Sequence, residues 1–280
     1  MSGLFGDPLV QRMLIVGLLV GLAAPVVGTF LVQRRMALLG DGIGHVALAG
    51  VAAGWLAGSA AGLAERDALA VPGAILFAIA AAVAMERLRA RGAAADVVMA
   101  VLFYGGIATG VLLISAAGGS NANLLGYLFG SISTVTWADA WVTVALAAVI
   151  VAVGIGLRPA LFAVTHDDEF ARSTGLPVNV LNTVIAVLAA VTITVAMRVV
   201  GVLLVSALMI LPVAIAQQLT RSFTRTMSLA MGIGAALTLT GIGITLEHDL
   251  QPGALIVVLG VVAYIAVSMV SHIRTSRRSP

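Results

Sequence analysis

The sequence predicts an all-α fold: a polytopic integral membrane bundle of about nine (eight to nine) transmembrane helices. Of the 280 residues, 61% are hydrophobic and only 10% are charged, whereas charged residues make up about a quarter of a soluble domain. The apolar residues form runs long enough to cross a hydrocarbon layer of ~30 Å as helices. None of these runs has the alternating pattern of a membrane β-barrel strand. We therefore expect one transmembrane domain over residues 1–280.

Nine apolar runs, each bounded by charged residues, proline or glycine, define the expected helices. In chain order they cover residues 9–32, 43–63, 69–86, 94–117, 136–157, 178–197, 199–219, 227–246 and 253–271. Residues 118–134 begin with a polar stretch and are too short to span, so an outer loop and a re-entrant segment both remain open. No basic region precedes the first run, and we therefore expect no cleavable signal peptide. Glycine at every fourth position from Gly50 to Gly62 predicts close helix packing.

The arginines predict the orientation, because cytoplasmic loops carry the excess of basic residues. All 15 basic residues are arginine. Twelve of them fall in alternate loops and the C-terminal tail: Arg34, Arg35, Arg87, Arg89, Arg91, Arg158, Arg172, Arg221, Arg225, Arg274, Arg277 and Arg278. The other three are Arg12, Arg66 and Arg198. The first set is therefore expected in the cytoplasm, with the N-terminus outside and the C-terminus inside.

The composition also excludes several kinds of site. A chain without lysine has no Walker A loop, whose lysine reaches the nucleotide phosphates, so any ATP that drives this protein must be bound by another chain. The absence of cysteine excludes disulfides and thiolate metal ligands. The arginines account for the isoelectric point near 10.2, and their loop distribution favours membrane orientation over nucleic-acid binding.

Asp41 and His45 form the strongest candidate functional site. They lie four residues apart in an apolar, glycine-rich run, so they share one face of the expected helix. An ionisable group at membrane depth costs at least ~3 kcal/mol and indicates function. A carboxylate and an imidazole are half of a divalent-metal site. If the helix leaves the surface near Arg35, the rise of 1.5 Å per residue places Asp41 about 10 Å and His45 about 15 Å deep. The alternative is structural: Asp41 caps the helix and His45 hydrogen-bonds a neighbouring carbonyl.

A second acidic cluster, Glu247-His248-Asp249, follows the eighth run on the expected outer side. It is either a possible entry point or outer gate for a metal ion, or an ordinary acidic loop. His166 and His272 lie in a loop and in the basic tail, and we do not expect them to bind transported metal.

Residues 165–177 predict a short cytoplasmic helix. Thr165 is the expected N-cap with Asp168 at the third position, and Asp167, Asp168 and Glu169 suit the positive helix start. Gly175 and Pro177 end it. With Phe170 as an apolar knob among charges such as Arg172, the helix suits docking into a groove on a soluble partner. The alternative is a simple bridge between two spans.

Three segments together resemble the membrane permease subunit of bacterial ABC transporters that import zinc or manganese. They are RRMALLGDGIGH at residues 34–45, DEFARSTGLP at 168–177 and MRVVGVLLVSALMILP at 197–212. The resemblance implies a non-catalytic permease domain in the bacterial cytoplasmic (inner) membrane, working as a homodimer. It also implies partner ATPase subunits that bind ATP and an extracytoplasmic metal-binding protein, with zinc or manganese as cargo rather than cofactor.

The resemblance further implies roles for particular residues. Asp41 and His45 match the family's metal-handling positions. The coupling helix that inserts into the ATPase corresponds to the segment with Asp167, Asp168, Glu169, Phe170, Arg172 and Gly175.

Two other functions remain open from the residues alone. The first is a proton-coupled secondary transporter of metal or another small solute that uses Asp41 and His45 without an ATPase. The second is an intramembrane enzyme, which the sequence disfavours because Ser206 lies in an apolar run with no histidine nearby in sequence.

Overall fold

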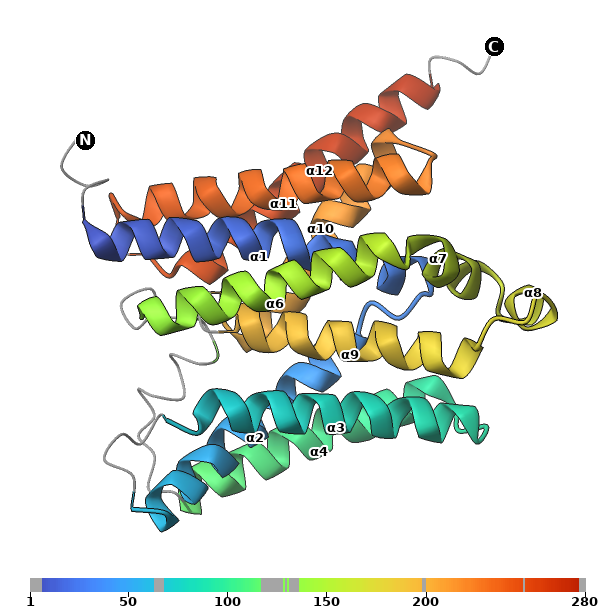
Figure 1. Ribbon diagram of the computed structural model, residues 1–280. Helices are drawn as coiled ribbons and strands as arrows, with labels where there is room; N and C mark the ends of the chain where they lie inside the picture. The colour runs from blue at the N-terminus through green and yellow to red at the C-terminus, as the bar shows by residue number, and fades with distance from the viewer. Residues whose placement is uncertain are drawn as a thin grey trace.

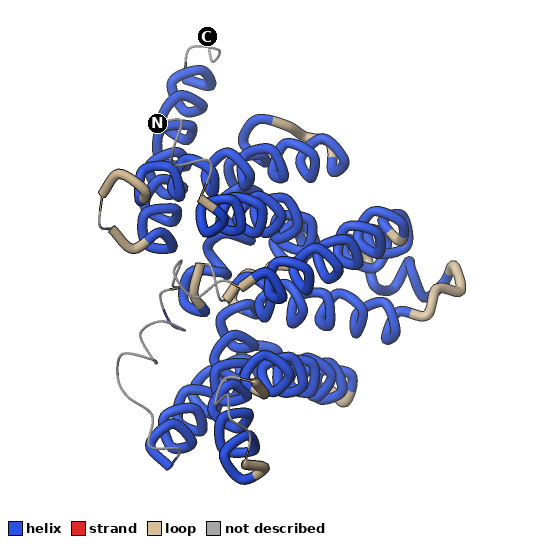
Figure 2. Tube along the Cα trace, turned by 60° about the vertical axis from the view of Figure 1, so that its left-hand side comes forward, coloured by secondary structure: helices blue, strands red, loops and turns tan. Residues whose placement is uncertain are grey.

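The structure, a computed structural model, describes residues 7–62, 68–116, 128, 130, 136–197, 200–248 and 250–276. All regular structure in these ranges is helical (Figures 1 and 2). The helices are α1 (Pro8–Gln33), α2 (Leu39–Ala60), α3 (Ala70–Ala90), α4 (Ala95–Ala116), α6 (Trp137–Gly156), α7 (Arg158–His166), α8 (Asp168–Ser173), α9 (Val178–Ala196), α10 (Val202–Leu219), α11 (Phe223–Thr245) and α12 (Pro252–Ser276).

The expected polytopic bundle is confirmed. In the part of the chain that the structure describes, eight helices are long and apolar enough to cross a membrane, and α10 supplies a shorter apolar helix. Each of the nine predicted runs corresponds to one of these helices. Of residues 118–134, only Leu128 and Gly130 are described, so the choice between outer loop and re-entrant segment lies outside the described residues.

The boundary difference that bears on the candidate site lies at the start of α2, which was expected at residue 43 and begins at Leu39. Gly40 and Gly42 weaken a helix in isolation, but neighbouring helices pack on both. A Cβ atom at Gly40 would lie 3.0 Å from Ser206 Oγ on α10, and one at Gly42 would lie 3.6 Å from Leu102 Cβ on α4. Tertiary packing therefore extends the helix through a stretch that its local propensity disfavours.

The helices fall into two groups joined by α9. In one group α2 packs against α3 and α4; in the other α1 packs against α11, α10 and α6, and α12 covers α10 and α11. Figure 2 shows α2–α4 together at the bottom of the view. Helix α9 contacts α2 and α3 on one side and α1 and α6 on the other. Because other helices cover α9 on two sides, most of its residues are buried.

Glycine allows backbones to touch inside the α2–α4 group. A Cβ atom at Gly50 of α2 would collide with the Gly73 carbonyl oxygen of α3, and one at Gly73 would collide with the Gly50 carbonyl oxygen. This is the close packing that the four-residue glycine spacing predicts.

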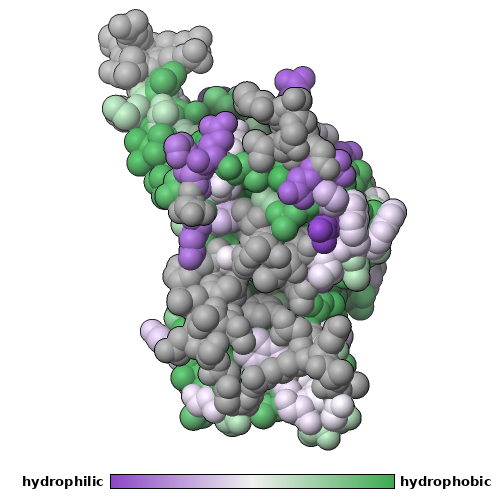
Figure 3. Space-filling view, turned by 90° about the vertical axis from the view of Figure 1, so that its left-hand side faces the viewer, coloured by the Kyte–Doolittle hydropathy of each residue, from purple (hydrophilic) through white to green (hydrophobic). Residues whose placement is uncertain are grey.

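Different helix ends lie at the two ends of the bundle. The N-terminus of α1 lies at the left of Figure 1, while α7, α8 and the end of α12 lie at the right. Figure 3 views the left-hand end, where hydrophilic side chains gather in the upper half of the face among apolar ones. The orientation predicted from the arginines would place the right-hand end in the cytoplasm and the left-hand end outside, and it stays a prediction.

The turn from α1 to α2 has an uncommon backbone. The amide of Arg35 donates to Val32 O, and the amide of Met36 donates to Leu31 O, which is the Schellman pattern of a helix C-terminus. The left-handed position of that pattern is normally glycine, but here Arg35 occupies it with φ 57°. An L-residue in this region costs about 1–2 kcal/mol, so the fold holds Arg35 there against its own preference.

Candidate functional site

Asp41 and His45 lie near the start of α2, inside the bundle. Asp41 is in the first helical turn and half-buried, and His45 is buried with 6% of its surface exposed. The helical rise from Leu39 to His45 is about 9 Å, less than the estimate of about 15 Å from Arg35. Figure 1 shows α2 starting well inside the edge at which α8 lies. The chain itself therefore brings the two residues inward before the helix begins.

Asp41 does not cap α2, so this part of the structural alternative is wrong. Leu38 is the N-cap of α2, and no side chain caps this end. Within the described residues, no hydrogen bond or ion pair reaches the Asp41 carboxylate. The positive end of α2 favours a charged carboxylate at this position.

The imidazole of His45 packs edge-on against a neighbouring ring and leaves one nitrogen unused. The ring centroids of His45 and Phe103 are 4.5 Å apart at an interplanar angle of 84°. His45 Nδ1 is buried and has no hydrogen-bond partner among the described residues. A buried polar atom without a partner costs ~1–3 kcal/mol. A histidine placed only for packing would be expected to satisfy this nitrogen, whereas a metal ligand keeps a lone pair free.

The helix geometry shows which way Asp41 and His45 face. Gly40 and Gly44 of α2 lie against Ser206 and Val202 of α10. Helix α4 lies on the opposite side of α2, where Leu102 meets Gly42 and Gly106 meets the backbone of His45 and Val46. Successive residues turn by about 100° around a helix, so Asp41 and His45 lie between the α10-facing and the α4-facing sides of α2, and we call this side the α4–α10 seam. Helices α3 and α9 lie on the other side of α2.

The pair is not a complete metal site by itself. No group of three or more His, Asp or Glu residues gathers within the described ranges. A cavity of about 550 Å³ lies elsewhere, between α6 and α9, and its lining is almost entirely valine, leucine and threonine. The described part of one chain therefore offers two ligands at the seam, and a coordinated cation would need further donors.

Ser206 was considered from the sequence only as a possible enzyme nucleophile, and its position beside Asp41 and His45 was not predicted. It is 4% exposed on α10, its hydroxyl has no hydrogen-bond partner in the described structure, and it lies against Gly40. It belongs to the 197–212 segment, whose role the sequence left open. A lone serine in an apolar helix was the only available signal, and its neighbour 166 positions earlier in the chain was not visible from sequence.

The packing of α4 against His45 gives a direct test of the site geometry. A Cβ atom at Gly106 would lie 2.7 Å from the Val46 nitrogen and 2.8 Å from the His45 carbonyl carbon. We expect Gly106→Ala to push α4 away from α2 and to lower stability by about 1–3 kcal/mol, measured by thermal unfolding in detergent. Gly105→Ala is the matched control, because a Cβ atom there meets nothing within 4 Å. Equal behaviour of the two variants would contradict the contact.

The outer cluster stands apart from this pair. Glu247 and His248 are exposed just beyond the end of α11, and α11 packs mainly on α1, α10 and α12. Asp249 lies outside the described residues. The structure thus brings neither Glu247 nor His248 to Asp41 and His45.

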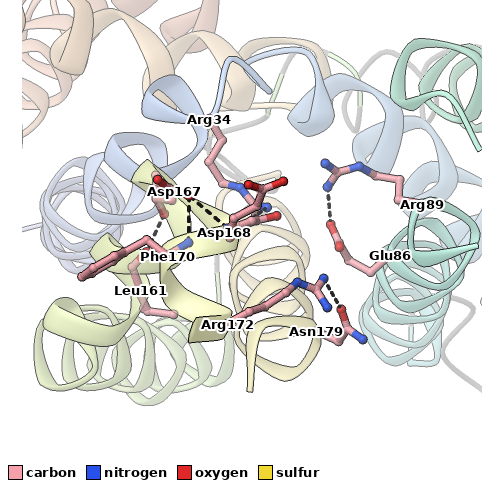
Figure 4. Close-up of polar contacts among 11 residues, drawn as sticks. Arg34, Glu86, Arg89, Leu161, Asp167, Asp168, Phe170, Arg172 and Asn179 are labelled. Atoms are coloured by element: carbon pink, nitrogen blue, oxygen red, sulfur yellow. Dashed lines mark hydrogen bonds and ion pairs between the residues drawn. The ribbon is translucent and has the colours of Figure 1, made fainter. Parts of the chain in front are cut away.

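The predicted short helix exists as α8, but its predicted cap is wrong. Thr165 lies inside α7, where its hydroxyl donates to Leu161 O at 2.6 Å. The N-cap of α8 is Asp167, whose Oδ1 accepts from the amides of Glu169 at 3.0 Å and Phe170 at 2.9 Å (Figure 4). The error arose because α7 runs through His166, so Thr165 continues one helix instead of starting the next. Asp168 is consequently the first residue of α8 rather than the third.

The end of α8 matches the prediction. Gly175 has φ 81°, a conformation that favours glycine, and Pro177 precedes α9. Arg172 donates to Asn179 Oδ1 at 3.3 Å, which ties α8 to the start of α9. The Phe170 side chain is 60% exposed, so a large apolar group is presented at the tip of the bundle.

The corrected cap predicts a local effect. Asp167→Ala should destabilise α8 by ~1 kcal/mol, the usual cost of losing an N-cap, and should raise hydrogen exchange at the Glu169 and Phe170 amides. Asp167→Asn should keep exchange near the original rate, because asparagine also caps. Unchanged exchange in Asp167→Ala would show that Asp167 is not the cap.

The comparisons with known proteins agree with this architecture. The model of the "ABC 3 transport family" matches residues 6–271. The manganese transport system membrane protein MntC of Halalkalibacterium halodurans is 30% identical over 89% of this chain and 82% of its own. The manganese import system permease protein ScaB of Streptococcus parasanguinis is 29% identical over 91% and 88%.

Among solved structures, a chain of PsaBC from Streptococcus pneumoniae in complex with Fab superposes with a TM-score of 0.82. It is 28% identical, and the match covers 95% of this chain and 93% of that one. Because the family model covers nearly the whole sequence, the chain belongs to the ABC 3 transport family.

Proposed function

We propose that this protein is the membrane-spanning permease subunit of an ATP-driven importer of a divalent transition metal ion. The observation that carries the proposal is the placement of Asp41 and His45 on the face of α2 toward the α4–α10 seam, with a buried imidazole nitrogen that nothing in the described structure uses. Two membrane-embedded ligands of oxygen and nitrogen type suit a divalent cation held weakly enough to be released.

Manganese is the first cargo to test, because relatives at 29–30% identity are named as manganese transport or import proteins. A carboxylate–imidazole pair also accepts zinc, so zinc is the second cation in every assay. In both cases the ion is cargo rather than a resident cofactor.

The remaining ligands and the energy source are assigned to other subunits. A second copy of this chain, placed against the α4–α10 seam, would bring another Asp41 and His45 to the ion, which supports a homodimer. ATP is bound by partner ATPase subunits, because the chain has no lysine for a Walker A loop. An extracytoplasmic metal-binding protein delivers the ion from the outer side, where Glu247, His248 and Asp249 act as an entry or gating cluster.

Helix α8 is proposed as the coupling helix to the ATPase. Its exposed Phe170, the capping Asp167, the acidic Asp168 and Glu169, and the Arg172 and Gly175 termination make a short, well-defined element at the bundle tip. ATP binding would close the ATPase, move α8, and expose the Asp41–His45 face alternately to the two sides of the cytoplasmic (inner) membrane.

The decisive experiment is uptake into liposomes. The chain is co-purified with its ATPase and binding protein and reconstituted, and entry of Mn²⁺ and Zn²⁺ is measured with and without ATP. We expect uptake only with ATP and the ATPase. Uptake by this chain alone, driven by a proton gradient, would overturn the proposal in favour of a secondary transporter.

A further inference from the structure

Arg34 is a buried cation at the cytoplasmic end of the bundle. It is the C-cap residue directly after α1, and only 6% of its side chain is exposed. Buried arginines are uncommon unless they are paired. The buried guanidinium of Arg34 therefore needs a negatively charged partner, and residues 31–38 around it contain no acidic side chain.

The partner comes from α8. Arg34 Nη2 lies 3.8 Å from Asp168 Oδ1, and the Asp168 side chain is 44% exposed. Figure 4 shows the Arg34 side chain running from the end of α1 to Asp168, with Glu86 and Arg89 of α3 to one side. Glu86 is buried and accepts from Arg89 Nη1 at 2.9 Å. Arg34 thus sits where α8 approaches the end of α1, within the field of a second carboxylate on α3.

Two carboxylates partly compensate the buried charge of Arg34. The pKa of Arg34 is lowered, chiefly by burial and also by Arg89, while the carboxylates of Asp168 and Glu86 oppose this shift. Because a guanidinium stays protonated in proteins, the group remains a cation that depends on Asp168 for compensation. Loss of Asp168 from this position would leave Arg34 without its nearest counter-charge.

The same residue begins the turn that leads to the candidate metal site. Arg35 follows in a left-handed conformation, Met36 is buried and Leu38 is 64% exposed. Helix α2 then starts at Leu39, with Asp41 in its first turn. Only six residues lie between Arg34 and Asp41, and they form a single hydrogen-bonded turn and the start of α2.

We propose that Arg34 is a positioning residue that transmits movement of α8 to the start of α2, and so to Asp41 and His45. The inference rests on the proposed function, because it assumes that α8 responds to the ATPase. The 3.8 Å separation is an ion pair without a short hydrogen bond, and such a contact can be remade at slightly different geometry during a cycle. If Asp168 moved, Arg34 would move with it, because the two side chains form an ion pair. The turn that follows, with Arg35 in its strained left-handed conformation, would then tilt the first turn of α2.

The test uses the reconstituted complex with ATPase and binding protein. In Arg34→Gln and Asp168→Asn we expect ATP hydrolysis to persist while Mn²⁺ taken up per ATP falls by about 10-fold, a normal size for coupling between sites. The double variant should be no worse than the worse single variant, because both act through one contact. Arg34→Lys, which keeps the charge, should recover part of the ratio. Arg91→Gln, an exposed arginine at the end of α3, is the matched control.

A second readout separates transmission from simple stabilisation. The chain has no native cysteine, so a spin label at Leu38→Cys reports on the turn alone. With Arg34 present, the line shape should change when nucleotide binds the ATPase; with Asp168→Asn it should stay constant, although nucleotide is still bound. If Arg34→Gln does not fold, Asp168→Asn on the more exposed partner still decides the question.

The outcomes distinguish this inference from the proposed function. Loss of the ATP requirement, or full transport by Asp41→Ala, contradicts the proposed function. ATP-dependent transport with an unchanged uptake-to-hydrolysis ratio in both Arg34→Gln and Asp168→Asn contradicts the inference alone. Multiplying losses in the double variant would also overturn it, because they would show two independent roles.

Discussion

Replacing Asp41 or His45 with alanine should abolish ATP-driven manganese uptake while the complex still assembles. Each change removes one of the two proposed ligand side chains on the α4–α10 side of α2, and neither one supports the fold through a hydrogen bond in the described structure. Removing the buried imidazole leaves a cavity, so His45→Ala should also lower the free energy of unfolding, by about 1–3 kcal/mol. Uptake of radioactive Mn²⁺ into liposomes, at equal amounts of assembled complex, measures the effect.

Two further variants test whether the Asp41 carboxylate itself is needed for uptake. Asp41→Asn keeps the volume and removes the charge, and should be as inactive as Asp41→Ala if the carboxylate binds the ion. Asp96→Ala removes an exposed carboxylate from the first turn of α4 and should transport normally. Transport at the original rate in both purified Asp41→Ala and His45→Ala would refute the site.

Replacing Phe170 with aspartate should prevent stable assembly with the ATPase, and with it both uptake and transport-coupled hydrolysis. Phe170 exposes 60% of its side chain at the tip of α8, and burying such a ring in a partner groove contributes about 1.5–3 kcal/mol. Phe170→Ala should weaken association by at least about 10-fold, because truncated aromatic anchors commonly cost 2 kcal/mol or more. Co-purification and titration of the two subunits in detergent measure the change.

The matched control is Leu88→Ala. Leu88 is also a large apolar side chain, 44% exposed, but it lies on the last turn of α3 rather than on α8. Weakening of the same size in both variants would show that α8 is not the specific docking element.

Hydropathy predicted the helices well because a membrane span is a local property of about 20 residues. The Asp41–His45 pair was likewise visible, since four-residue spacing places two side chains on one helical face without knowledge of the fold. The start of α2 was placed too late, because Gly40 and Gly42 are helical only through contacts with α10 and α4. Local propensity has no access to such contacts.

Features that join distant parts of the chain could not be predicted. Ser206 against Gly40 and Asp168 against Arg34 bring together residues more than 130 positions apart. The misplaced cap of α8 has a different origin: Thr165 and Asp167 are both good caps, and only the extent of α7 decides between them. The sequence therefore identified the candidate site residues but not the distant residues that the fold brings next to the start of α2 and to α8.

The backbone contacts at Gly50, Gly73 and Gly106 have a mechanical consequence. At these three glycines the backbones themselves are in contact, so the points of contact cannot yield by a change of rotamer, and close-packed interiors are barely compressible. We therefore expect a tilt of α2 to carry α3 and α4 with it, and sliding to occur at the boundaries with α9 and α10, where side chains such as Ile193, Val202 and Ser206 lie against the glycines of α2.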